Sequence, residues 1–452
     1  MPDHPIASTA LPLSGKEMSE VALKCLEVAR EKGASDAEVE VSAAVGQAVT
    51  VRRGEVETVE YNRDKGLGIT VYLGARRGNA STSDLSPEAI ARTVEAACAI
   101  ARHTAGDEAA GLPDAERLYR GTPPDLDLYH PWSLTVDEAI ELARRTEAAA
   151  LAVDKRITNS EGATVSSYDT DFILANTRGF LGGFPNSKAS IGCGVVAEER
   201  GAMQRDYWFT THRDPNRLED AHAVGRTAGE RAVRRLGGRR VPTGEVPVLF
   251  DANIAASLIG HFVSAASGSS LYRQSSFLLG KLGAQVFAPH VRIHEDPHLA
   301  GAMASGYFDA EGVTTSARDV VDAGVLTGWF LSTYSGRKLG LATTGNAGGN
   351  HNLVVAPGER DYEGLLALMG RGFVVTELMG QGVNPVTGDY SRGASGFWVE
   401  GGEIRFPVEE VTIAGNLLDM YRGIAAVGSD VLVRGSKQCG SILVEKMTIA
   451  GD

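Results

Sequence analysis

The sequence predicts an α+β fold, in which an N-terminal helix–sheet domain precedes a glycine-rich, mostly antiparallel and barrel-like β domain. Before residue 240, amphipathic helical segments alternate with strand segments of period two. The chain has 54 glycines, and those after residue 240 cluster in segments such as GQG, GNAGG and EGGEI, which indicate tight turns between short strands. A closed arrangement is expected there because antiparallel strands need covered edges.

We expect a flexible N-terminus over residues 1–20, an α/β domain over 21–240 and a β-rich domain over 241–452. A chain of 452 residues is long enough for two to three domains with large cores. The linker is predicted near residues 237–246. The basic run Arg234 to Arg240, RRLGGRR, is interpreted as a solvated helix end that leads into this linker.

Helices are predicted in both halves, each from its apolar period and its terminal residues. In the N-terminal half they span residues 19–32, 87–101, 137–152 and 214–236, with Ser86 as a cap before Pro87. In the C-terminal half they span 255–266, with Asn253 as its cap, and 362–369, with Gly370 as the C-cap. Strands of the N-terminal sheet are expected at 37–53, 56–62, 68–73, 78–82, 163–175, 179–197 and 201–210, with a turn at Gly54.

Composition favours a cytoplasmic protein. The net charge of −13 argues against nucleic acid and anionic membranes as partners. The four cysteines (Cys25, Cys98, Cys193 and Cys439) are widely spaced, which indicates neither a disulfide framework nor a structural zinc site. The first twenty residues lack the pattern of a signal peptide, and no apolar run is long enough to span a bilayer.

The segment from 253 to 270, NIAASLIGHFVSAASGSS, resembles a metallopeptidase helix that has lost most of its metal site. An H-E-x-x-H or H-E-x-x-x-H helix needs two histidines and a glutamate that activates water. His261 stands at the first ligand position, but Phe262 replaces the glutamate and Ala266 stands where the second histidine of H-E-x-x-x-H would be. From the residues alone, His261 is interpreted as a packed histidine rather than a ligand.

Four further segments together resemble the TldD/PmbA family of metallopeptidases. Three lie in the C-terminal half, at 374–404, 410–417 and 438–451, and one lies in the N-terminal half, at 54–97. The chain looks like the PmbA branch, also called TldE. The resemblance implies that TldD-like chains carry the intact helix and a late cysteine as third ligand. Only His261 and Cys439 match those positions here, so we expect no metal and no cofactor in this chain, and zinc in a TldD-like partner.

Three other residues or motifs are candidates for a function. His294 to His298, HEDPH, matches H-E-x-x-H literally, but Pro297 is incompatible with a helix interior, so a short strand and polar loop are expected. Cys439 is open to a thiolate nucleophile, a vestigial ligand or a structural role, with a structural role favoured. His351, after GNAGGN, is expected to make substrate or structural contacts rather than bind metal.

The resemblance implies a two-subunit peptidase for unfolded or extended peptides, including peptide-antibiotic precursors and antitoxins. This chain would pair with a TldD-like subunit and form a homodimer when alone. Two alternatives stay open. The chain could itself be an active hydrolase, with metal held by His261, Cys439 and a third group, or it could be a non-enzymatic peptide-binding or scaffolding protein.

Overall fold

The structure, a computed structural model, describes residues 11–451. Residues 1–10 of the expected flexible N-terminus therefore lie outside the described residues, as does Asp452. The N-terminal half is built on one long antiparallel sheet with the strand order β3-β2-β1-β4-β6-β7, and β5 pairs with β4. These strands are β1 (Asp36–Arg52), β2 (Glu55–Leu73), β3 (Arg76–Thr82), β4 (Ile157–Asn176), β5 (Leu181–Gly182), β6 (Asn186–Glu199) and β7 (Ala202–His212).

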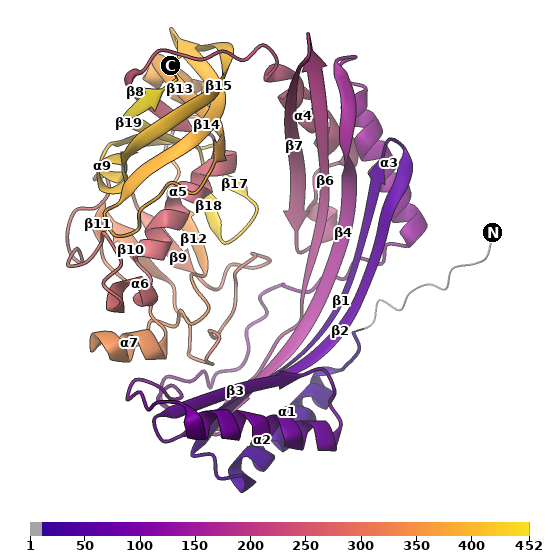
Figure 1. The fold of residues 1–452 in the computed structure, drawn as a ribbon, viewed down its shortest axis with the longest axis vertical. Helices are drawn as coiled ribbons and strands as arrows, with labels where there is room; N and C mark the ends of the chain where they lie inside the picture. The colour runs from indigo at the N-terminus through magenta and orange to yellow at the C-terminus, as the bar shows by residue number, and fades with distance from the viewer. Residues whose placement is uncertain (1–10, 452) are drawn as a thin grey trace.

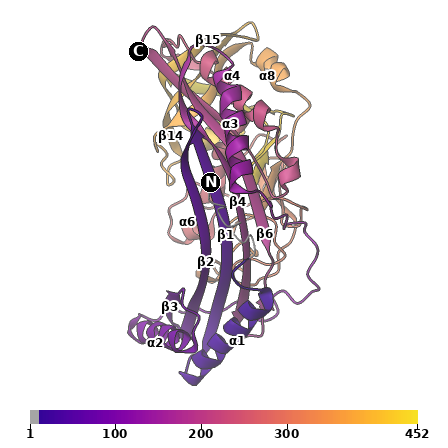
Figure 2. The same ribbon diagram turned by 90° about the vertical axis from the view of Figure 1, so that its right-hand side faces the viewer.

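Two pairs of helices cover two ends of this sheet (Figures 1 and 2). At one end, α1 (Gly15–Glu31) and α2 (Pro87–His103) enclose Val39, Leu67 and Ile69 in a common core. At the other end, α3 (Val136–Leu151) and α4 (Ala221–Arg234) enclose Val49 and Val165. Because β1 and β4 run the length of the sheet, the same strands contribute to both cores.

Helix caps explain where these helices begin. Ser14 and Glu17 form a capping box at the start of α1, so this helix begins earlier than the expected residue 19. The prediction of one helix over 214–236 is wrong about where the helix starts. Asp214 caps a short 3₁₀ turn (Pro215–Arg217), and Asp220 then caps α4 with bonds from the amides of residues 222 and 223.

Five strands of the C-terminal half form a closed barrel, which confirms the barrel-like prediction. They are β8 (Gly244–Phe250), β13 (Arg371–Met379), β14 (Asp389–Glu400), β15 (Glu403–Asn416) and β19 (Ile442–Ala450). β15 pairs with both β14 and β19, which closes the ring. β8 and β13 pair parallel and the other barrel pairs are antiparallel. Gly401 and Gly402, both with positive φ, form the hairpin turn between β14 and β15.

A second, six-stranded sheet lies beside the barrel, in the order β11-β10-β9-β12-β18-β17. Its strands are β9 (Ile293–Asp296), β10 (Arg318–Asp322), β11 (Val325–Leu326), β12 (Asn352–Val355), β17 (Leu432–Val433) and β18 (Lys437–Cys439); β16 (Ile424–Val427) extends the barrel at β19. The remaining helices are α5 (Ala252–Ala265), α6 (Gly268–Tyr272), α7 (Thr333–Leu339), α8 (Tyr362–Met369), which Gly370 ends as predicted, and α9 (Leu417–Arg422).

Helix α5 joins the barrel to the second sheet. It follows β8 directly and contacts β13 of the barrel and β18 of the second sheet. Leu258 and Ile259 are buried in one core together with barrel residues such as Phe250 and Phe373. Apolar burial on both sides therefore fixes the position of the helix. No helix within residues 11–451 has the length and apolar character needed to cross a membrane.

Candidate functional site

The start of α5 differs from the sequence-based prediction. Asp251, and not Asn253, is the cap, since its side chain accepts a hydrogen bond from the Asn253 amide at 3.0 Å. Asn253 is therefore inside the first turn. Its side-chain oxygen accepts a hydrogen bond from Nη1 of Arg434 at 2.6 Å, which ties the helix start to the loop between β17 and β18.

One face of α5 is polar. Asn253, Ser257 and His261 follow one another at intervals of four residues, so their side chains lie along one stripe. Ser257 is exposed and His261 is half-buried. The His261 ring lies edge-on to Tyr390 of β14, with 5.9 Å between ring centroids. Its Nε2 atom is buried without a hydrogen-bond partner, so this face ends in an unsatisfied polar atom.

Phe262 and Ala266, which stand at the positions that the resemblance assigns to the glutamate and the second histidine, share a different face of α5. Both are fully buried. The Phe262 ring packs edge-on against Phe287 at 5.1 Å and Phe330 at 6.3 Å. Ala266 ends the helix, with its amide donating to the carbonyl of Phe262 at 2.8 Å. This face is hydrocarbon core, in which a charged general base would be desolvated.

Cys439 lies on β18, against which α5 packs. Burial raises the pKa of its thiol to about 12, and the nearby charge of Asp430 adds to this effect while Lys437 opposes it. The thiol is therefore protonated at neutral pH, whereas the thiolate is the form that attacks or binds metal. All four cysteines of the chain are free and buried.

The donors around α5 do not fit a zinc ion. Catalytic zinc normally has three protein ligands and one open position. The candidate zinc ligands here are His261 and Cys439. The Cys439 thiol is protonated, so it is not in the form that binds a metal. Burial lowers the pKa of His261, and the positive charge of Arg392 lowers it further; the same positive charge disfavours a cation at this position. Within residues 11–451 no group of three or more His, Cys, Asp and Glu side chains is arranged to hold a metal.

The literal H-E-x-x-H match is a strand followed by a turn, as predicted. Residues 293–296 form β9, and Pro297 and His298 follow in the turn. Nδ1 of His294 lies 2.8 Å from a carboxylate oxygen of Asp319, and Nε2 of His298 lies 3.1 Å from the Thr315 hydroxyl. Both histidines thus have partners of their own.

His351 makes structural contacts. Its amide donates to the buried carboxylate of Glu295 at 2.8 Å, and its ring Nε2 lies 2.9 Å from the carbonyl oxygen of Gly345. Glu295 also accepts a hydrogen bond from Arg318 at 2.9 Å. His351 and Glu295 therefore belong to a buried network that holds loops of the C-terminal half together.

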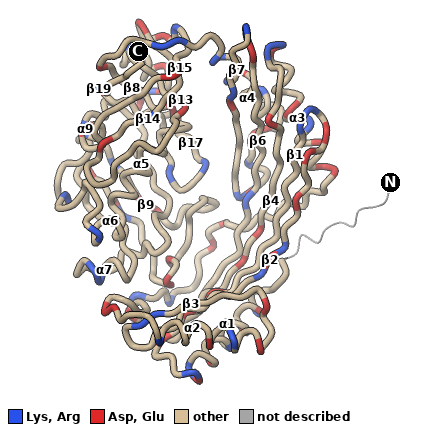
Figure 3. Tube along the Cα trace, viewed as in Figure 1, with Lys and Arg blue, Asp and Glu red and all other residues tan. Residues whose placement is uncertain are grey.

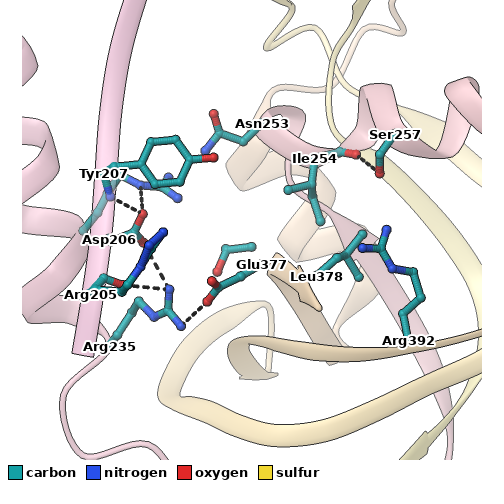
Figure 4. A pocket seen from close by; sticks show the side chains of 12 residues that line it. Arg205, Asp206, Tyr207, Arg235, Asn253, Ile254, Ser257, Glu377, Leu378 and Arg392 are labelled. Atoms are coloured by element: carbon teal, nitrogen blue, oxygen red, sulfur yellow. Dashed lines mark hydrogen bonds and ion pairs between the residues drawn. The ribbon is translucent and has the colours of Figure 1, made fainter. Parts of the chain in front are cut away.

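A pocket of about 340 Å³ lies between the two halves of the chain, where β7 and α4 approach α5, β13 and β14 (Figure 4). We call it the arginine pocket, because four arginines line it: Arg205, Arg231, Arg235 and Arg392. Asn253 and Ser257 of the polar α5 face also line it. The pocket therefore opens onto the face of α5 that carries His261.

Carboxylates pair with some of these arginines. Asp206 lies 3.1 Å from Nε of Arg231 and 3.7 Å from Nη1 of Arg235, and Glu377 forms an ion pair with Arg235. The pocket lining thus holds four guanidinium groups against two carboxylates, Asp206 and Glu377. Acidic and basic positions are otherwise scattered over both halves (Figure 3), so a cationic pocket stands out in a chain of net charge −13.

The sequence alone does not predict this pocket. Its residues come from segments between 205 and 392 that only the fold brings together. The interpretation of Arg234 to Arg240 as solvated is wrong for Arg235, whose side chain is 11% exposed. The density of arginines in that run was the one feature of the sequence that pointed toward a cationic pocket. It did not predict that β13 lies close to α4.

Comparison with known proteins assigns the chain to a family. Residues 37–101 match the PmbA/TldA metallopeptidase domain 1, residues 129–236 its central domain and residues 243–451 its C-terminal domain. The metalloprotease PmbA of Escherichia coli O157:H7 is 50% identical over 437 residues, 96% of each chain. A TldD homolog of Haemophilus influenzae is 24% identical over 398 residues, covering 83% of this chain and 81% of the other.

Solved structures agree. A candidate modulator of DNA gyrase from Bacteroides thetaiotaomicron is 29% identical, with a TM-score of 0.92, covering 96% of this chain and 98% of the other. The fold of TldE from Thermococcus kodakarensis is also similar, with a TM-score of 0.84 at 21% identity, covering 95% of this chain and 100% of the other. The chain belongs to the PmbA/TldD metallopeptidase family. Within it, the chain belongs to the PmbA/TldE branch.

Proposed function

We propose that this chain is the non-catalytic, PmbA/TldE-like subunit of a two-subunit metallopeptidase for unfolded or extended peptides, with the catalytic zinc on a TldD-like partner. The burial of Phe262 and Ala266 in the aromatic core carries this proposal. Restoring a glutamate and a histidine there would require a cavity and water that the packing excludes.

The edge of the N-terminal sheet supports a role in holding extended peptides. β7 ends the strand order, so within the described residues one of its edges has no neighbouring strand. This edge lies on the side of the sheet nearest the barrel (Figure 1), and Arg205, Asp206 and Tyr207 of β7 line the arginine pocket. A peptide that adds as a strand gains main-chain hydrogen bonds with little dependence on its sequence.

Metal analysis of the purified chain tests the assignment of zinc to the partner. We expect well below one zinc per chain after dialysis against a weak chelator, and the same content in His261→Ala. About one tightly bound zinc per wild-type chain that disappears in His261→Ala would instead favour an active hydrolase.

The partner is tested by co-purification from a host that expresses a TldD-like chain. Recovery of both chains together supports the two-subunit peptidase. A chain that binds extended peptides but never a TldD-like subunit would indicate a peptide-binding or scaffolding protein.

A further inference from the structure

Arg392 of β14 has no carboxylate partner among residues 11–451, although it lines the arginine pocket. Its Nε atom is buried and has no hydrogen-bond acceptor. The other arginines of the pocket are paired: Arg231 and Arg235 with Asp206, and Arg205 with Glu161 at 3.5 Å. Arg392 is therefore the cation of this pocket whose counter-charge must come from elsewhere.

Two more buried polar atoms lie beside Arg392. Tyr390 precedes it by two residues, so both side chains are on one face of β14. Tyr390 is 2% exposed, and its hydroxyl is buried beside the Arg392 guanidinium, which works against the rise of the phenol pKa that burial causes. Nε2 of His261, whose ring contacts Tyr390, is unpartnered. A guanidinium, a phenol and an imidazole thus lie close together, and of these three groups it is Arg392 that lines the arginine pocket.

Their ionisation suits an anionic ligand. Burial raises the pKa of Tyr390 to about 12, so its hydroxyl keeps its proton. Burial also lowers the pKa of His261, so the imidazole is neutral and can donate one hydrogen bond in the appropriate tautomer. Leaving a partly buried charge without a counter-charge is costly. A bound carboxylate would supply that counter-charge to the Arg392 guanidinium.

We propose that Arg392 binds a carboxylate of an extended peptide that lies in the arginine pocket. A guanidinium fork matches the two oxygens of a carboxylate, and about 340 Å³ is within the range of small ligand sites. Figure 4 shows Arg392 on the opposite side of the pocket from Arg235, and Ser257 of α5 also lines the pocket. A peptide paired with the edge of β7 would reach this position.

The carboxylate has two possible sources, the C-terminus of the peptide and an Asp or Glu side chain. This inference rests on the proposed function, because it names the chemistry by which this subunit would recognise its substrate. It concerns binding by this chain alone, which can be measured without the partner.

Fluorescence anisotropy with three unstructured Gly/Ser/Ala peptides, each with a neutral dye at its N-terminus, tests the proposal. The first has a free C-terminus and no acidic residue, the second is the same peptide amidated, and the third is amidated with one internal Asp. We expect the first or the third to bind at least about tenfold tighter than the second, an effect typical of a charge-assisted pair. Preference for the first identifies the C-terminus, and preference for the third identifies a side chain.

Arg392→Gln should abolish this preference, so that all three peptides bind alike. Arg405→Gln is the matched control, since Arg405 is an exposed arginine of β15 paired with Glu403 at 2.9 Å, and it should bind as the wild type does. The thermal midpoint of Arg392→Gln should be unchanged or higher, because an unpaired charge is removed. A merely structural arginine would instead lower it.

Ser257→Glu provides a second variant that keeps Arg392 and places a carboxylate in the pocket from the exposed face of α5. It should weaken binding of the preferred peptide to the level of the amidated one. The proposal is overturned if wild type binds all three peptides equally or none of them, or if both variants retain the preference. Such a result leaves the zinc and co-purification tests of the proposed function untouched, and their failure would not remove carboxylate binding.

Discussion

At the scale of single residues, two neighbours on α5 have opposite roles. Phe262 is fully buried against Phe287 and Phe330, so Phe262→Ala should lower the free energy of unfolding by about 3–5 kcal/mol. His261→Ala should cost less than about 1 kcal/mol, because the unpartnered Nε2 atom loses no bond. Urea unfolding followed by circular dichroism measures both. A larger cost for His261→Ala, present only with added zinc, would show that His261 binds metal.

Glu38 of β1 should make stability depend on pH. Burial raises the pKa of its carboxyl to about 8, with additional increases from the charges of Glu311 and Asp309, while Arg77 opposes them. Between the unfolded value, near 4.5, and about 8, the native state binds more protons than the unfolded state at this group. Its contribution to stability is therefore largest below pH 4.5 and is lost as the pH rises through 8.

Glu38→Gln should then stabilise the chain by on the order of 1–3 kcal/mol at pH 9 and change little at pH 4, since amide and protonated acid are both neutral. Thermal melts from pH 4 to 9 provide the measurement. Glu60→Gln, at an exposed position of β2, is the control and should follow the wild type. Parallel melting profiles for Glu38→Gln and wild type would contradict the prediction.

The residue types on α5 were enough to predict that the metallopeptidase motif is incomplete, because Phe262 stands at the position of the glutamate. They did not predict which residues surround the helix. The ion pair of Arg235 with Glu377 joins residues 142 positions apart, and the contact of His261 with Tyr390 joins α5 to β14. Pairings of this kind depend on how the halves pack, so the arginine pocket could not be derived from residue types.

At the scale of elements, β9 shows that a sequence motif needs its secondary structure. A strand places neighbouring residues on opposite faces, whereas the zinc motif requires a helix to bring positions i and i+4 together. His294→Ala with His298→Ala should leave peptide hydrolysis by the assembled peptidase within about twofold of wild type. The lost contacts to Asp319 and Thr315 should lower stability by about 1–2 kcal/mol.

Peptide hydrolysis and size-exclusion chromatography of the double variant test this prediction together. Loss of hydrolysis in a variant that still folds and assembles would mean that the motif is functional. Loss of assembly alone would instead indicate that the β9–β10 contacts support the interface.

Elements with clear local signals were predicted well, and those without were not. Pro87 after Ser86 marked the start of α2, and Gly370 marked the end of α8. The start of α4 was misplaced because two aspartates of the same segment, Asp214 and Asp220, each cap a helical segment of their own. Short strands such as β17 and β18 carry too few residues to show a period, and their pairing is set by the surrounding sheet.

At the scale of the whole molecule, a closed barrel was expected because strand edges need to be covered. Which strands close the barrel could not be predicted. β15 and β19 pair with each other although α9, β16, β17 and β18 lie between them in the sequence. The long N-terminal sheet stays open, with β7 facing the C-terminal half (Figure 1). An open edge beside a cationic pocket suits a subunit that holds a peptide for a partner.

The last prediction concerns that partner. The chain should form a two-chain assembly with a TldD-like subunit in preference to a homodimer, because a second chain can cover strand edges and restrict access to unfolded peptides. Adding this chain to the TldD-like subunit should raise hydrolysis of an extended peptide at least about tenfold, whereas a compact folded domain of the same composition should stay intact. The Arg405→Gln variant should raise hydrolysis as much as the wild type does, so it serves as the control for the preparation of a substituted chain. If the TldD-like subunit cleaves the extended peptide as fast without this chain, the role assigned to it is wrong.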